Sequence, residues 1–198
     1  MRRLILWSGG VESTSLLKQY LSETSDDIFA HYIRMVNPEG RLASENQAVI
    51  TLTPLLRDIR PFNLSFSDIS ICGGKALPND IKVLMMIGSA AFYYHQCDTM
   101  YVGCSFEDRD IRTTVNGVHT VIKRPDTWWN DFQSLLQPLL KPEHSAKDIL
   151  PYHPSGDWPK KQHMEYLGEL LQYTHSCRRP EKGLCGKCHS CLERNGHE

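Results

Sequence analysis

The sequence has no excess of charge, no long apolar run and no internal repeat, and each absence excludes a class of protein. Its 22 lysines and arginines balance 23 aspartates and glutamates. This nearly neutral net charge gives no reason to expect a protein that binds nucleic acids non-specifically. No apolar stretch approaches the length that crosses a membrane, and no repeat or low-complexity tract is visible. Hydrophobic residues make up 40% of 198 positions, which is typical of one globular domain with a substantial core.

The beginning of the chain lacks the apolar segment of a secretory signal. Met1-Arg2-Arg3 is followed by a run too short for that purpose. We therefore expect a cytoplasmic protein in a reducing compartment, in which the seven cysteines form no disulfides.

What the sequence does have is a loop rich in glycine and hydroxyl groups. The apolar run at 3–7 leads directly into Ser8-Gly9-Gly10-Val11-Glu12-Ser13-Thr14, where helical spacing of apolar residues begins. Glycines allow close approach of the backbone, and a helix N-terminus favours negative charge. An ordinary turn with a serine cap is the alternative. We predict that five residues form an anion site suited to phosphate groups: Ser8, Gly9, Gly10, Ser13 and Thr14.

Four cysteines near the end of the chain form the second informative pattern. The four are Cys177, Cys185, Cys188 and Cys191. Two C-x-x-C steps that share a cysteine, plus one cysteine further back, can place four thiolates around one structural zinc ion. Lys187 and Arg194 would offset the thiolate charge. An iron–sulfur cluster is the alternative to zinc.

Strands and helices alternate over the first hundred residues. Apolar runs predict strands at 3–7, 28–35, 62–66 and 100–103, and helical spacing predicts helices at 11–22, 42–58 and 79–95. This alternation predicts a doubly wound α/β fold, a parallel sheet with the first strand in its centre. Ligands of such sheets bind at the carboxyl ends of the strands, where the glycine loop lies.

The pattern changes after Gly103. Asn116-Gly117 between two β-prone runs predicts a β-hairpin over 112–122, placed as a flap at the ligand end. A helix over 127–140, a proline-containing loop over 142–159 and a helix over 160–173 are expected to follow. We interpret residues 1–198 as a single domain with a zinc-binding tail at 177–191.

The glycine loop resembles the pyrophosphate-binding loop of the PP-loop ATP pyrophosphatases, which have an adenine nucleotide alpha hydrolase-like fold. They include GMP synthetase, asparagine synthetase, tRNA thiolases and 7-cyano-7-deazaguanine synthase. The tail narrows the resemblance to the last family (QueC-type), because Cys185-Gly186-Lys187-Cys188-His189-Ser190-Cys191-Leu192-Glu193-Arg194 is similar to its CGxCxSC-x-x-R motif. Ser176-Cys177 and Gly103 also match. The chain departs from the family at Glu12, where aspartate is usual, and in its middle segments.

This resemblance implies an ATP-dependent carbon–nitrogen ligase. It would convert 7-carboxy-7-deazaguanine and ammonia into the nitrile 7-cyano-7-deazaguanine (preQ0), a step of queuosine biosynthesis. It implies catalytic roles for Ser8, Glu12 and Ser13, substrate contacts by Gly103 and Asp126, Mg²⁺ as a companion of ATP, and a homodimer.

Several alternatives stay open. A related PP-loop ligase could act on a different deazaguanine, a nucleotide or a protein group in a nucleic-acid modification or defence pathway. A zinc-bearing nucleic-acid adaptor without catalysis is a third class, which the neutral charge and the intact loop disfavour. Glu12 could merely complement the helix dipole, and Asp126 could cap a helix. Five basic residues are candidates for neutralising phosphate: Arg34, Arg109, Arg112, Lys123 and Arg124.

Overall fold

Four parallel strands form the central sheet of the computed structural model. It describes residues 1–36, 40–70, 80–104, 110–115, 118–123, 128–175, 177, 185–186 and 188–195. The strands are β1 (Arg2–Leu6), β2 (Asp27–Val36), β3 (Asn63–Ser70) and β4 (Thr99–Val102). They lie in the order β3-β2-β1-β4, and every neighbouring pair is parallel. The prediction of a parallel α/β sheet with an interior first strand is confirmed.

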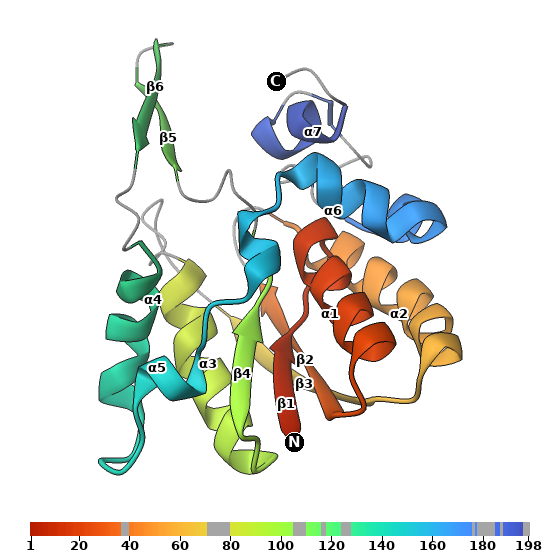
Figure 1. Cartoon of the computed structure of the whole chain (residues 1–198). Coiled ribbons are helices and arrows are strands. Elements are labelled where there is room, and N and C mark those ends of the chain that lie inside the picture. The colour runs from red at the N-terminus through yellow and green to blue at the C-terminus, as the bar shows by residue number, and fades with distance from the viewer. Residues whose placement is uncertain are drawn as a thin grey trace.

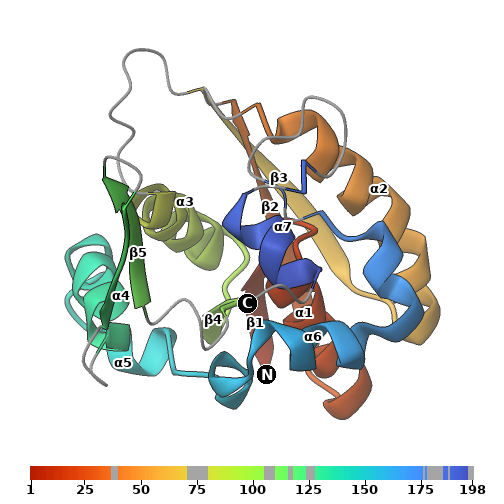
Figure 2. The same cartoon turned by 90° about the horizontal axis from the view of Figure 1, so that it is seen from above.

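Helices cover both faces of the sheet (Figures 1 and 2). One face is covered by α1 (Val11–Glu23) and α2 (Leu42–Ile59), and α6 (Lys160–Leu167) packs along α1. The other face is covered by α3 (Asp80–Tyr94), α4 (Trp128–Leu136) and α5 (Ala146–Ile149). Among the described residues, no helix has the length and apolar character needed to span a membrane.

Strand β1 shows why the core has two layers. Side chains alternate between the faces of a strand, so Leu4 and Leu6 join the cluster under α3 and α4, while Ile5 and the following Trp7 join the cluster under α1 and α2. A strand buried on both faces reads as a continuous apolar run, and this run brings the glycine loop to the centre of the sheet edge.

A two-stranded antiparallel hairpin stands beyond the carboxyl ends of the sheet strands (Figure 1). It is formed by β5 (Asp110–Val115) and β6 (Val118–Lys123). The predicted hairpin at 112–122 falls on this pair, and the Asn116-Gly117 turn lies outside the described residues.

In the second half of the chain, the helices are shorter and more often interrupted than the sequence pattern predicted. Instead of one helix over 127–140, α4 gives way to a 3-10 turn, η2 (Gln137–Leu139), because Pro138 cannot continue an α-helix. The predicted loop over 142–159 contains α5 and a second 3-10 turn, η3 (Pro154–Asp157).

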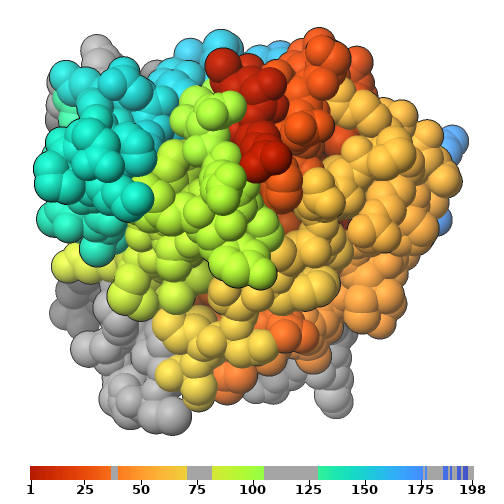
Figure 3. Space-filling view, turned by 90° about the horizontal axis from the view of Figure 1, so that it is seen from below, coloured from red at the N-terminus to blue at the C-terminus, as the bar shows by residue number. Residues whose placement is uncertain are grey.

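The predicted last helix also divides. Helix α6 ends at Leu167, and η4 (Gly168–Tyr173) follows from Gly168, whose φ of +57° favours glycine. A short helix, α7 (His189–Arg194), ends the described chain. The opposite end of the molecule is where the strands begin, with the red N-terminal residues at the surface (Figure 3).

Candidate active site and four-cysteine centre

The segment Ser8–Thr14, called loop 8–14 below, connects the end of β1 to the first turn of α1. Gly9 has a φ of +74°, and a Cβ there would lie 2.9 Å from the Cβ of Ala48 in α2. Gly10 is the N-cap residue of α1, and no side chain caps this end of the helix. Since the first N–H groups of a helix have no partner within it, loop 8–14 is suited to an anion.

The hydroxyl groups of Ser8 and Ser13 lie together in the loop. Ser8 Oγ and Ser13 Oγ are 3.2 Å apart, and the backbone N–H groups of Gly10 and Ser8 lie 3.4 Å from Ser8 Oγ and 3.3 Å from Ser13 Oγ, respectively. Ser8 is exposed, whereas Ser13 is buried. These contacts give the loop a compact group of donors on the side of the carboxyl edge.

Thr14 is turned away from this group. Its side chain is fully buried, and its hydroxyl accepts a hydrogen bond of 3.0 Å from the indole of Trp7. Its backbone N–H donates to Gly10 O. In this structure the side chain of Thr14 belongs to the core, and its contact with phosphate stays a prediction.

Gly103 follows β4 and packs against the first turn of α1. A Cβ at this position would lie 2.4 Å from Ser13 Cα and 2.5 Å from Ser13 N, which is shorter than any real contact. Only glycine lets the end of β4 approach loop 8–14 so closely. The family resemblance implied a substrate contact for Gly103, which stays a prediction, and the structure shows this packing against Ser13.

Glu12 forms a largely buried ion pair that sequence reasoning missed. Glu12 Oε1 lies 3.1 Å from Lys160 Nζ, and the side chains are 18% and 6% exposed. Lys160 is the first residue of α6, where a cation opposes the helix dipole. No local pattern around Lys160 indicates this partner, since the exposed Lys161 beside it has the same sequence surroundings.

The ion pair keeps Glu12 charged. Burial alone would raise its pKa, but the charge of Lys160, together with hydrogen bonds from the backbone and from Lys160, outweighs burial and lowers the pKa of Glu12. A carboxylate in contact with a buried lysine does more than complement the helix dipole.

The four predicted metal ligands come together in the tail. Cys177, Cys185, Cys188 and Cys191 have all their Sγ atoms within 4.8 Å of one another. Cys177 and Cys191 are fully buried, and Gly186, with a φ of +66°, forms the turn between two of the ligands. We call this group the four-cysteine centre.

The distances between the four sulfur atoms indicate whether a single zinc ion or an iron–sulfur cluster fits the four-cysteine centre. Zinc–sulfur bonds of about 2.3 Å place the corners of a tetrahedron about 3.8 Å apart. Cys185 Sγ lies 3.9 Å from Cys191 Sγ, and Cys188 Sγ lies 4.0 Å from Cys177 Sγ. In a 4Fe–4S cluster each thiolate binds a different iron, so its sulfurs lie further apart. The four-cysteine centre fits a single tetrahedral ion.

Arg194, which was predicted to offset thiolate charge, interacts electrostatically with Cys191 and also binds backbone carbonyls. Its guanidinium donates to Leu171 O at 2.7 Å and to Thr174 O at 3.1 Å. It therefore ties α7 to the end of η4. Lys187, the other predicted counter-charge, lies outside the described residues.

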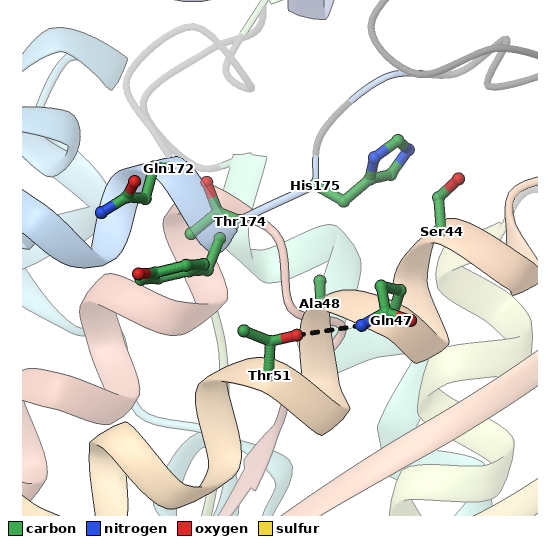
Figure 4. Close-up of a pocket in the computed structure, with 8 residues that line it drawn as sticks. Ser44, Gln47, Ala48, Thr51, Gln172, Thr174 and His175 are labelled. Carbon is green, nitrogen blue, oxygen red and sulfur yellow. Dashed lines mark hydrogen bonds between the residues drawn. The ribbon is translucent and has the colours of Figure 1, made fainter.

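A surface pocket of about 290 Å³ lies between α2 and the segment 172–175 (Figure 4). Most of the side chains that line the pocket are polar and uncharged. Within it, the side-chain amide of Gln47 donates a hydrogen bond to the hydroxyl of Thr51. Ala48, which lines the pocket, is also the residue against which Gly9 packs. The pocket therefore adjoins loop 8–14 on the α2 side.

The remaining predicted site residues are not brought to the loop by described contacts. Arg34 pairs with Asp68 at 2.5 Å across β2 and β3. Arg112 and Lys123 belong to the hairpin strands. The other three candidates lie outside the described residues: Arg109, Arg124 and Asp126.

Comparison with protein-family models finds no match for this chain, and comparison with curated proteins finds none. Among solved structures, the chain is similar to the U34-tRNA thiolase NcsA from Methanococcus maripaludis with its 4Fe-4S cluster. The TM-score is 0.53 at 13% sequence identity, and the match covers 98% of this chain and 66% of the thiolase chain. At that identity the likeness shows the fold, a parallel α/β sheet of this type.

Proposed function

We propose that this chain is an ATP-dependent PP-loop enzyme that activates a carboxylate by adenylation and transfers it to ammonia. The observation that carries the proposal is loop 8–14 itself: an uncapped helix N-terminus with two neighbouring serine hydroxyls at the carboxyl edge of a parallel sheet. Such an edge is where α/β folds bind ligands. The likeness in fold to a tRNA thiolase, one of the classes that the loop resembles, supports it.

In the first step, the substrate carboxylate would attack the α-phosphorus of ATP and release pyrophosphate. Ser8, Gly9, Gly10 and Ser13 would hold the leaving pyrophosphate through backbone and hydroxyl donors. Mg²⁺, when bound with ATP, shares the negative charge of the phosphates. The buried Glu12–Lys160 pair would hold the first turn of α1 in place beneath them.

In the second step, ammonia would attack the acyl adenylate, and loss of AMP and a proton would give the amide. A second ATP would then activate the amide oxygen, again with release of pyrophosphate. Loss of AMP and of both amide protons would leave the nitrile. We assign 7-carboxy-7-deazaguanine as the acceptor and 7-cyano-7-deazaguanine as the product, because loop and tail together resemble that family.

We assign zinc to the four-cysteine centre. Sulfur–sulfur distances of 3.9 and 4.0 Å support one tetrahedral ion with all four positions filled by protein, which is typical of a structural zinc. Its four thiolates would hold the tail against the sheet edge and take no part in the chemical steps.

A second candidate, tRNA thiolation, is favoured by one observation. The similar solved structure is a tRNA thiolase that carries a 4Fe-4S cluster. It would require an iron–sulfur cluster at the four-cysteine centre, which the close sulfur spacing disfavours, and a tRNA surface, which the balanced charge of the chain disfavours.

Incubation with ATP, Mg²⁺, ammonia and 7-carboxy-7-deazaguanine, followed by mass spectrometry, tests the proposal. We expect pyrophosphate, AMP and the nitrile, with no product when ammonia is left out. Release of pyrophosphate with a different deazaguanine or nucleotide acceptor would redirect the assignment to a related ligase. Absence of any ATP turnover with all acceptors would refute the enzyme assignment.

A further inference from the structure

The backbone of His175 lies against both glycines of loop 8–14. Its N–H donates a 2.9 Å hydrogen bond to Gly9 O. A Cβ on Gly10 would lie 3.4 Å from His175 O, so the carbonyl of His175 also flanks this residue. The position of His175 therefore helps to determine where the two glycines lie.

The imidazole of the same residue contacts the backbone of one residue of the four-cysteine centre. His175 Nε2 lies 3.0 Å from Cys177 O, and because a carbonyl can only accept, the ring nitrogen is the donor. Cys177 is the first metal ligand of the tail. One residue thus contacts loop 8–14 through its backbone and a metal-ligand residue through its side chain.

Arg194 provides a second connection between the tail and this segment. It lies on α7, the helix that also carries Cys191. Its guanidinium donates to Leu171 O, to Thr174 O and to Thr174 Oγ1, the last at 3.0 Å. A metal ion bound to Cys191 would therefore hold α7 in place. Through Arg194, α7 would in turn hold Thr174, the residue before His175.

We propose that the four-cysteine centre positions loop 8–14 through His175 and Arg194, so that metal binding and nucleotide binding strengthen each other. This inference rests on the proposed function, because it takes loop 8–14 to be the nucleotide site. His175 and Arg194 are positioning residues, since neither belongs to the loop nor supplies a metal ligand. Coupling between two binding sites is reciprocal, so each ligand raises the affinity for the other by the same factor.

The first test measures that factor on the full-length protein. The dissociation constant of Mg²⁺–ATP is measured by calorimetry with the metal bound and after removal of the metal by a chelator. We expect binding about tenfold weaker after removal, within the usual range for such coupling. Competition with a zinc-binding dye, with and without Mg²⁺–ATP, should return the same factor for zinc.

A pair of matched arginine variants separates positioning from general stability. Arg60 also donates to backbone carbonyls, those of Tyr20, Thr24 and Asp26, but at the end of α1 far from the loop. We expect Arg194→Gln, with its zinc content unchanged, to bind Mg²⁺–ATP several-fold more weakly than the parent. Arg60→Gln should keep the parental affinity in the metal-loaded protein, even where it lowers the melting temperature.

Variants of His175 test the second connection. His175→Ala loses the donor to Cys177 O and should weaken nucleotide binding in the metal-loaded protein. His175→Gln keeps an N–H donor on its side chain and should restore much of the affinity. A purely structural residue would change the melting temperature without this order of nucleotide affinities.

The outcomes distinguish the inference from the function on which it rests. A metal-loaded parent protein that binds no Mg²⁺–ATP refutes the nucleotide site and, with it, the inference. Equal nucleotide affinity with and without metal, or equal losses in Arg194→Gln and Arg60→Gln, overturns the coupling alone and leaves the proposed function standing.

Discussion

Loop 8–14 and the four-cysteine centre lie at the same end of the sheet but are held there by different means. The loop follows a central strand and packs against the backbone at Gly103. The tail is joined to the rest of the chain by side-chain hydrogen bonds such as those of Arg194 and contains a helix of only six residues. The comparison teaches that the loop is shaped by the fold, whereas we expect the tail to depend on a metal ion at the four-cysteine centre.

The largest effect is expected where the loop meets β4. Gly103→Ala places a Cβ 2.4 Å from Ser13 Cα, and because this contact is with backbone, a strand or helix must move. We expect a loss of at least about 3 kcal/mol in the free energy of unfolding, measured with urea, and loss of nucleotide binding.

Gly88→Ala is the matched control for this prediction. Its Cβ would lie 2.8 Å from Met100 Sδ and 2.9 Å from Leu6 Cδ1, but these atoms end flexible side chains that can shift. The cost should be about 1 kcal/mol. Equal stability of Gly103→Ala and the parent would show that β4 does not constrain the loop.

The next effect tests the tail. Cys188→Ser should remove the metal and lower the melting temperature by roughly 10 °C or more, while the sheet keeps its far-ultraviolet circular dichroism. Elemental analysis should find one zinc per chain in the parent. Cys97→Ala, a change at a buried cysteine remote from the tail, should keep the metal, and iron in the parent would contradict the zinc assignment.

The ion pair beneath the loop should have an intermediate effect. Lys160→Met leaves the carboxylate of Glu12 buried without this cation, which costs about 3 kcal/mol, and the double variant with Glu12→Gln should lose less than the sum of the single losses. Lys161→Met is the control, because its side chain is 84% exposed and its pairing with Glu165 is loose.

This pair also predicts a pH dependence. Because the pKa of Glu12 is lowered in the folded protein, its stabilising contribution is complete above the unfolded pKa of about 4.3. The contribution is lost as the pH falls through the folded pKa. Urea unfolding at pH 7 and pH 3 should show a smaller acid-dependent loss in Lys160→Met; an unchanged loss would count against the ion pair.

The smallest effect is expected on the sheet, away from both regions. Burial and the neighbouring His95 lower the pKa of His31 to about 4, so the unfolded chain takes up a proton near pH 6.5 that the folded protein does not. Stability should therefore fall as the pH drops from 6.5 to 4. His31→Gln should flatten this slope in melting temperatures; an identical slope would refute the contribution of His31.

The sequence by itself determined the features that depend on neighbouring residues. The apolar run before Ser8, the glycines after it and the alternation of strands and helices predicted the sheet and the place of the loop. The spacing of Cys185, Cys188 and Cys191 predicted the four-cysteine centre. These patterns are readable because strand, turn and knuckle geometry extends over only a few residues.

Only the tertiary structure decided which distant groups meet at those sites. Glu12 was interpreted as a metal or dipole partner, and its contact turned out to be Lys160, which α6 brings back to α1. Thr14 was predicted to bind phosphate, and its hydroxyl contacts the indole of Trp7 in the core. No pattern in the sequence predicted a role for His175, yet it contacts both loop and tail. The physical reason is that such pairs depend on how helices pack across the sheet, and no local spacing in the sequence records that packing.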